Sequence, residues 1–189
     1  QGYFRQRLPS HGWQEAIYEP VDIADVPIHP VNDADGGELR IEVWMGGRTV
    51  QARIWRVQVG RVPLYLIDTD VPENEPWDRE LSARLYSGDS EVRIRQEIML
   101  GIGGVRLLHK LGYRPSVLHM NEGHSAFLLL ESVREEVARG LDFEAACELV
   151  KSRTVFTTHT PVPAGHDAFS FSLMDKYFPG YLDGLGFVH

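Results

Sequence analysis

Two stretches of sequence decide the fold: SVLHMNEGH at 116–124 and TVFTTHTP at 154–161. Each begins with a short apolar or β-branched run, which is typical of a strand, and ends in a polar loop. Helical patterns lie between the two stretches and after them. This order predicts a βαβ unit, in which the two strands are parallel and helices cover them.

The helical patterns place apolar residues at intervals of three and four. The expected helices cover 91–112, 126–140, 142–151 and 167–177. Ser90 is the expected N-cap of the first helix, and Asp142 that of the third. Gly101, Gly103 and Gly104 lower the helix propensity of the first, so we expect them to allow close packing against a neighbour.

The first third of the chain has a different character. Residues 1–38 are expected to be irregular, with aromatic and proline residues scattered along them. From 39 to 45 apolar and polar residues alternate, which indicates a half-buried strand. Gly46-Gly47 is a hairpin signal, since both residues can take a positive φ. Further strand patterns extend this predicted antiparallel β region over 39–68.

Composition excludes several classes of protein. The 189 residues are 43% apolar and carry a net charge of −8, from 19 Lys and Arg against 27 Asp and Glu. The acidic balance disfavours nucleic acid as a partner. No run of eighteen apolar residues predicts a membrane helix, so no membrane partner is expected. Cys147 is the single cysteine, which fits a reducing, cytoplasmic location, and we expect it to pack in the interior.

The candidate site follows from strand order. Ligands bind beyond the carboxyl ends of parallel strands. Asn121, Glu122 and His124 follow one predicted strand, and His159 follows the other, so we expect them at one edge of the sheet. Gly123 permits close backbone approach at a helix start, where free N–H groups favour oxygen ligands. These features suit a hydroxyl-rich ligand.

Other interpretations stay open at this point. Asn121 and Glu122 also fit a plain helix start, and His159 also fits a buried core histidine. A metal site is a sharper alternative, and its candidate ligands are His119, Glu122, His124, His159, His166 and Asp167. Their spacing is not that of a helical His-Glu-x-x-His site, and the two clusters lie far apart in sequence, so we expect no metal.

Several segments together resemble one family, the α-glucan (glycogen, starch and maltodextrin) phosphorylases, above all their bacterial and archaeal branch. The similar segments are GYFRQ at 2–6, GWQE at 12–15, LYSGD at 85–89, RIRQE at 93–97, HMNEGHSAF at 119–127 and FTTHTPVPAGHD at 156–167. The last two are the most specific, and the resemblance covers nearly the whole chain.

The resemblance implies an α/β chain, namely part of the Rossmann-like N-terminal domain of a GT-B fold. Residues 1–189 are then a partial domain, with the antiparallel region at 39–68 and a βα region with sugar-site loops at 91–189. Since the chain lacks an initiator Met and a polar tail, we expect a piece of a longer protein.

The resemblance also implies site roles. His159 is the expected catalytic residue, which hydrogen-bonds the glucosyl unit at the cleavage point. Asn121, Glu122, His124 and Thr160 are expected to bind substrate. Asp89 is expected to belong to a mobile gate over the site.

The implied reaction is phosphorolysis of an α-1,4-glucan to glucose 1-phosphate, so glucan, phosphate and glucose 1-phosphate are the expected partners. A homo-oligomer is left open. The implied cofactor is pyridoxal 5'-phosphate, but Lys110, Lys151 and Lys176 stand in no matching motif. We therefore expect no cofactor-binding residue in this chain and no activity from it alone. The alternatives are a metal-dependent hydrolase, using the histidines at 119, 124, 159 and 166, and a non-catalytic glucan-binding module.

Overall fold

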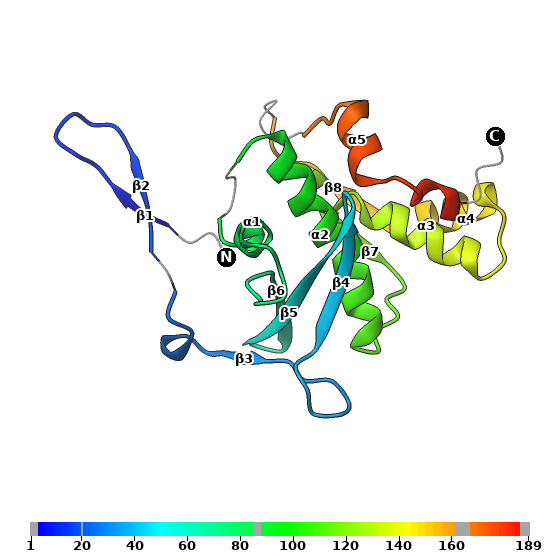
Figure 1. Ribbon diagram of the computed structural model, residues 1–189, viewed down its shortest axis with the longest axis horizontal. Helices are drawn as coiled ribbons and strands as arrows, with labels where there is room; N and C mark the ends of the chain where they lie inside the picture. The colour runs from blue at the N-terminus through cyan, green and yellow to red at the C-terminus, as the bar shows by residue number, and fades with distance from the viewer. Residues whose placement is uncertain (1–3, 20, 85–87, 162–166, 186–189) are drawn as a thin grey trace. The chain divides into compact units, whose positions relative to one another are not determined.

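The computed structural model describes residues 4–19, 21–84, 88–161 and 167–185 (Figure 1). The chain divides into two compact units, Gln1–Ile41 with Val50–Ser87 and Glu42–Thr49 with Gly88–His189. It is a mixed α/β structure with one parallel and several antiparallel strand pairs. In the part described, no helix is long and apolar enough to cross a membrane.

The N-terminal segment is more regular than predicted. Strands β1 (Phe4–Arg7) and β2 (Glu15–Tyr18) form an antiparallel hairpin, followed by the 3-10 helix η1 (Ile23–Asp25) and strand β3 (Ile28–Pro30). All four residues of β2 are exposed. A strand without a buried face has no alternation of apolar and polar residues, so its sequence lacked the usual signal.

The antiparallel region predicted at 39–68 is confirmed. It consists of β4 (Arg40–Met45), β5 (Arg48–Val59) and β6 (Val62–Asp68), with β6 pairing antiparallel to β5. Gly46 and Gly47, between β4 and β5, have φ values of 57° and 97°, as a tight hairpin turn requires. The alternating apolar residues of β4 are buried.

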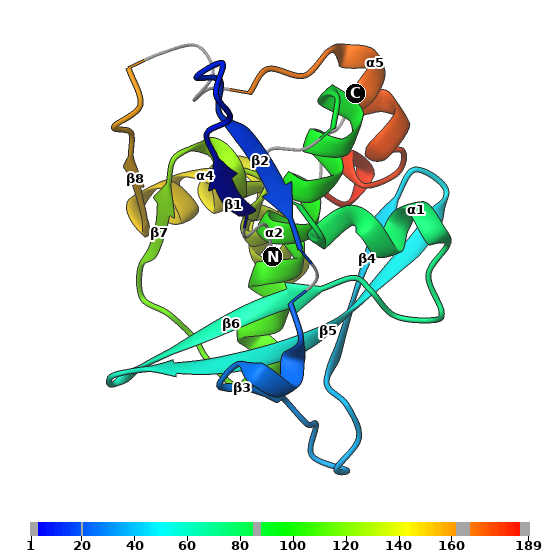
Figure 2. The same cartoon turned by 90° about the vertical axis from the view of Figure 1, so that its left-hand side faces the viewer.

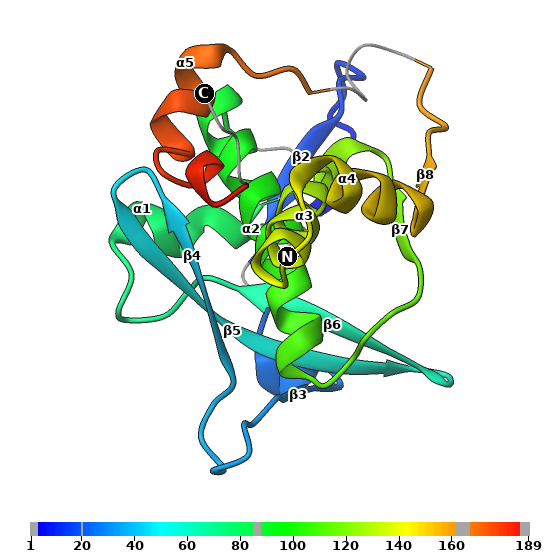
Figure 3. The same ribbon diagram turned by 90° about the vertical axis from the view of Figure 1, so that its right-hand side faces the viewer.

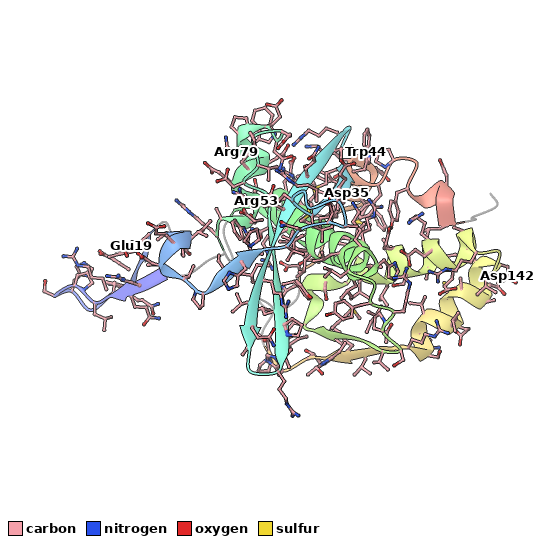
Figure 4. The ribbon with its side chains drawn as sticks, turned by 90° about the horizontal axis from the view of Figure 1, so that it is seen from below. Glu19, Asp35, Trp44, Arg53, Arg79 and Asp142 are labelled. Carbon is pink, nitrogen blue, oxygen red and sulfur yellow. The ribbon has the colours of Figure 1, made fainter. Side chains whose placement is uncertain are left out.

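A polar loop and two short helices, α1 (Pro76–Arg79) and η2 (Glu80–Ser82), follow β6. The buried Asn74 side chain ties the loop to β5, because it accepts from Gln51 N at 2.9 Å and donates to Gln51 O at 2.7 Å. Arg53 donates to the carbonyl of Asp70, and Arg79 donates to the Asp70 carboxylate (Figure 4).

Helix α2 (Ser90–Lys110) is the longest helix described, and both its start and its N-cap lie one residue earlier than we predicted. Asp89, not Ser90, is the N-cap: its Oδ1 accepts from Glu91 N at 3.0 Å and from Val92 N at 3.1 Å. Both residue types cap helices well, so sequence alone did not distinguish them. Gly112 follows the helix with φ +80°, as a C-terminal glycine does.

The predicted parallel strand pair is confirmed. Strands β7 (Leu118–Asn121) and β8 (Thr154–Thr157) are parallel neighbours (Figure 2). The crossover between them contains the 3-10 helix η3 (Gly123–Ser125) and the helices α3 (Leu128–Ala138) and α4 (Phe143–Ser152). Asp142 caps α4, as expected, through a 2.8 Å bond from Ala145 N (Figure 4).

Helices α3 and α4 lie side by side and share one apolar cluster (Figure 3). Its buried members are Val133, Ala146, Val150 and Leu185, the last from the 3-10 helix η5 (Leu182–Leu185). Cys147 packs against this cluster, and burial raises the pKa of its thiol. The expectation that this cysteine packs against apolar residues is confirmed, but Cys147 is half-buried and does not lie fully in the interior.

The last helix is shorter than predicted. Helix α5 covers Phe171–Tyr177 rather than starting at Asp167, because Ser170 caps it by accepting from Leu173 N. Asp167 is therefore released from the helix and available for the contacts described below.

Glu131 of α3 is fully buried, yet charged neighbours satisfy it. Its carboxylate accepts hydrogen bonds from Arg106 of α2, from Arg134 and from the Tyr181 hydroxyl. Burial by itself would raise the pKa of Glu131, but these bonds outweigh burial and lower it to about 2. The ion pairs join α2 to α3 and so hold the crossover in place.

Gly101 provides the close packing that the glycines of α2 predicted. A Cβ built on it would lie 2.7 Å from Leu128 N and 2.9 Å from Phe127 C, at the start of α3. Such distances leave no room for a methyl group, and backbone cannot move aside as a side chain can. Gly104 has nothing within 4 Å of the same position.

We expect Gly101→Ala to destabilise the protein by about 1–3 kcal/mol, since overpacking forces the backbone of two helices apart. The matched control is Gly104→Ala, which should stabilise by about 0.5–1 kcal/mol through helix propensity alone. Urea denaturation of both variants measures the difference. Equal effects of the two substitutions would contradict the packing account.

Candidate functional site

The site is built where β7 and β8 end. Asn121 is the last residue of β7 and pairs with Thr157, the last residue of β8. Glu122 N donates to Thr157 O at 2.8 Å, which extends the parallel ladder by one step. The segments that follow the two strands leave the sheet at the same edge, and the polar loops predicted to meet there do meet.

One carboxylate joins the two loops. Glu122 Oε1 accepts from the backbone N–H of His159 at 2.8 Å and of Thr160 at 2.9 Å. Only 5% of Glu122 is exposed. The His159 N–H bond is the largest of several effects that lower the pKa of Glu122 to about 2, so the group is ionised at neutral pH. Within the described residues, its second oxygen is buried without a hydrogen-bond partner.

Glu122 also has an unusual backbone. Its φ of +62° with ψ of −175° makes it the one non-glycine residue of the described ranges with a positive φ. This region is occupied almost only by glycine, and a larger residue stays there when its surroundings hold it. The hydrogen bonds of its carboxylate and of its N–H provide that constraint.

The His159 ring lies in the open at this edge, with 62% of its side chain exposed. Its Nε2 is 2.9 Å from Asn121 Oδ1, and its Nδ1 is 3.3 Å from Glu122 Oε1. His159 is therefore not a buried core histidine, and Asn121 orients the ring instead of capping a helix. Glu122 stands at the N-cap position of η3, but its side chain makes no cap bond there.

His124 faces a second group of side chains. Its Nδ1 lies 3.3 Å from Arg93 Nη2, and Arg93 also forms an ion pair with Asp167. Arginine can only donate, so Nδ1 of His124 must accept. In a neutral ring the N–H is then at Nε2.

The metal ligands considered above do not gather into one set. His119 is exposed on β7 with its Nε2 2.7 Å from Thr157 Oγ1, while His166 lies outside the described residues. Among the described ranges, Glu97, His124 and Asp167 do bring ligand atoms within 4.8 Å of one another. The Arg93 guanidinium already forms an ion pair with Asp167 in this cluster.

The remaining predicted binding residue, Asp89, serves as the N-cap of α2. The gate stretch that precedes it, at 85–87, falls outside the described residues. Its expected role toward substrate therefore stays a prediction.

A hollow of about 320 Å³ opens near the other ends of the strands. Leu118 and Thr154, the first residues of β7 and β8, line it together with Arg114, Arg139 and Arg153. Parallel sheets bind ligands at their carboxyl edge, so we place the candidate site at Glu122 and His159 rather than here.

Known proteins match nearly the whole chain. This chain is 50% identical over 184 residues to the glycogen phosphorylase of Mycobacterium tuberculosis. The matched region covers 93% of this chain and 21% of that protein. It is 46% identical over 184 residues to the maltodextrin phosphorylase of Thermococcus litoralis (97% and 22%) and 38% identical over 178 residues to the glycogen phosphorylase of Aquifex aeolicus (94% and 26%). No family model matches the chain.

The chain is homologous to one segment of the glycogen and maltodextrin phosphorylases. The resemblance seen in the sequence is thereby confirmed. The chain spans about a fifth to a quarter of the length of these phosphorylases.

Sequence reasoning about the site missed Arg93 and Glu97 of α2. Both lie in the RIRQE segment at 93–97, which was quoted for its resemblance to the family without a role for either residue. A signal was present, since residues four apart share one face of a helix and oppositely charged residues at this spacing can pair. Their Nη2 and Oε1 atoms are 3.8 Å apart.

We expect Glu122→Gln to remove an acid-sensitive part of the stability. The folded pKa of about 2 lies below the ordinary 4.5, so the unfolded chain binds more protons in this range. The contribution is present above pH 4.5 and is lost as the pH falls toward about 2. The variant should therefore be less stable than wild type near neutral pH, with the gap narrowing in acid.

Urea midpoints at about pH 6 and about pH 3 measure this gap. Glu148→Gln is the control, because the Glu148 carboxylate is exposed and pairs with Lys151 on the surface. A gap for Glu122→Gln that does not change with pH would contradict the account.

Proposed function

We propose that this chain is part of the N-terminal half of an α-glucan phosphorylase with a GT-B fold. Its parent protein would transfer a glucosyl unit from an α-1,4-glucan to phosphate. The observation that supports this most is the Glu122 carboxylate, which holds both polar loops inside the segment shared with the phosphorylases. Glucan, phosphate and glucose 1-phosphate are the proposed partners.

The residues at the candidate site have separate proposed roles. Glu122 positions the backbone at His159 and Thr160, since its carboxylate accepts both N–H groups. Asn121 orients the exposed His159 ring. The proposed role of that ring is to hydrogen-bond a hydroxyl of the glucosyl unit, and His124 is proposed to bind the same unit. Fixed donors of this kind reject ligands without matching hydroxyls.

The proposed reaction breaks the bond between C1 of the terminal glucosyl unit and the glycosidic oxygen. A phosphate oxygen bonds to C1, and the glycosidic oxygen takes up the proton that the attacking hydrogen phosphate gives up, as the shortened glucan leaves. Positive charge develops near C1 on the way. The His159 carbonyl belongs to a peptide that Glu122 holds in place, so its dipole is already oriented and would need little reorganisation as that charge develops.

The lysines of this chain do not fit a pyridoxal phosphate site. Lys176 forms an ion pair with Glu91, and Lys151 pairs with Glu148 on the surface. Lys110, in the last turn of α2, is exposed. We propose that residues outside this chain hold the cofactor in the parent protein, and that the chain alone does not catalyse phosphorolysis.

Exposed apolar residues agree with a partial domain. Val155 and Phe156 of β8 are 50% and 51% exposed. A parallel sheet is normally covered on both faces, so such residues are expected to be covered in a complete domain. The metal-dependent hydrolase is the weaker candidate, because a metal at Glu97, His124 and Asp167 would have to displace Arg93.

In the parent protein, we expect His159→Ala to lower kcat/KM for maltodextrin phosphorolysis by about 100-fold or more, as the loss of a preorganised polar group does. The control is His119→Ala, which removes an exposed ring from the neighbouring strand and should change kcat/KM by less than about threefold. Release of glucose 1-phosphate measures both. Similar losses of kcat/KM in the two variants would contradict the role assigned to His159.

For the chain alone, we expect no stoichiometric adduct with pyridoxal phosphate. The test adds the cofactor, reduces any imine with borohydride and weighs the product by mass spectrometry. An active adduct with one lysine modified would refute the view that the cofactor site lies elsewhere. A chain that binds maltooligosaccharide without turnover would instead favour the glucan-binding module.

A further inference from the structure

Four charged or titratable side chains meet beside the candidate site. Arg93 and Glu97 lie one turn apart on α2, His124 lies in η3, and Asp167 lies before α5. Arg93 pairs with Asp167 and is 3.3 Å from His124 Nδ1. Glu97, His124 and Asp167 place one ligand-type atom each within 4.8 Å of one another.

The charges of this cluster do not balance if both carboxyl groups are ionised. Glu97 is only 4% exposed. Its Oε1 lies 3.8 Å from Arg93 Nη2, too far for a hydrogen bond, and has no hydrogen-bond partner in the described ranges. The guanidinium is instead bonded to Asp167.

Two carboxyl groups this close cannot both ionise readily, so the pair holds one proton. Asp167 has the guanidinium, and burial leaves Glu97 as the group that keeps the proton. Burial, followed by the hydrogen bond to Asp167 and its charge, raises the pKa of Glu97 to about 8. The charged and titratable groups recorded around Glu97 are Arg93 from its own helix, His124 from η3 and Asp167 from the segment before α5.

We propose that Glu97 is a positioning residue, which keeps a proton at neutral pH and uses it to donate a hydrogen bond to Asp167. The neutral Glu97 leaves Arg93 bonded to Asp167 and facing His124. Arg93 in turn holds His124 in the tautomer that has its N–H at Nε2. We infer that the protonation of Glu97 sets the pH range of glucan turnover, and this inference rests on the proposed function.

Loss of the proton changes the cluster. A second negative charge beside Asp167 repels that carboxylate and attracts the guanidinium, because Oε1 of Glu97 is already its neighbour at 3.8 Å. Arg93 is then drawn toward Glu97 and away from His124 Nδ1. The tautomer of His124 is no longer selected, and substrate binding weakens in alkali.

The first experiment compares pH profiles of kcat/KM for maltodextrin phosphorolysis in the parent protein. Wild type should lose activity above about pH 8, by about tenfold per pH unit. Glu97→Gln should keep neutral-pH activity within about threefold and lose this alkaline limb, since an amide stays neutral and still donates to Asp167. The control, Glu148→Gln, should keep the wild-type profile.

The second experiment detects the proton itself and needs no activity. The infrared spectrum of the wild-type parent protein near neutral pH should contain a protonated-carboxyl band that Glu97→Gln lacks. The band should vanish as the pH rises past about 8. In Asp167→Asn it should vanish at a lower pH, because the second negative charge is gone. That variant also serves if Glu97→Gln fails to fold.

Three results would overturn the proposal: an alkaline limb unchanged in Glu97→Gln, no protonated carboxyl assignable to Glu97, or loss of activity on treatment with a metal chelator that Zn²⁺ restores at this cluster. A protein that shows the band but no phosphorolysis would refute the proposed function and leave the shared proton standing.

Discussion

The site depends on one interaction, the bonding of the Glu122 carboxylate to two consecutive backbone N–H groups. The acceptor follows β7, and the donors, His159 and Thr160, follow β8. A parallel pair of strands brings the two loops to one edge, but only a fixed contact between them sets the position of one loop against the other. An ionised, nearly buried carboxylate is a strong acceptor, so it holds the backbone of His159 while the ring stays exposed.

The two buried glutamates near this edge show how environment sets the state of the same side chain. N–H donors surround Glu122 and lower its pKa, whereas burial and a neighbouring carboxyl raise that of Glu97. The first is suited to hold a backbone through negative charge. The second, as proposed, is suited to hold a neighbour by donating a proton.

The rest of the second unit keeps these groups in place. Gly101 lets α2 approach the start of α3 at backbone distance, and the buried Glu131 joins the same two helices through Arg106. Helix α2 carries Arg93 and Glu97, so its placement against α3 decides where they stand. The chemistry of the edge therefore rests on contacts well away from it.

By itself, the sequence determined the parallel strands, the helices between them and the meeting of Glu122 and His159 at one edge. These follow from local periodicity and from strand direction, which act over a few residues. The tertiary structure alone decided that Asp89 caps α2, that Ser170 starts α5 late, and that Asp167 turns to Arg93 and Glu97. Such contacts join residues up to 74 positions apart. Their partners are chosen by burial and charge in three dimensions, which no spacing along the chain records.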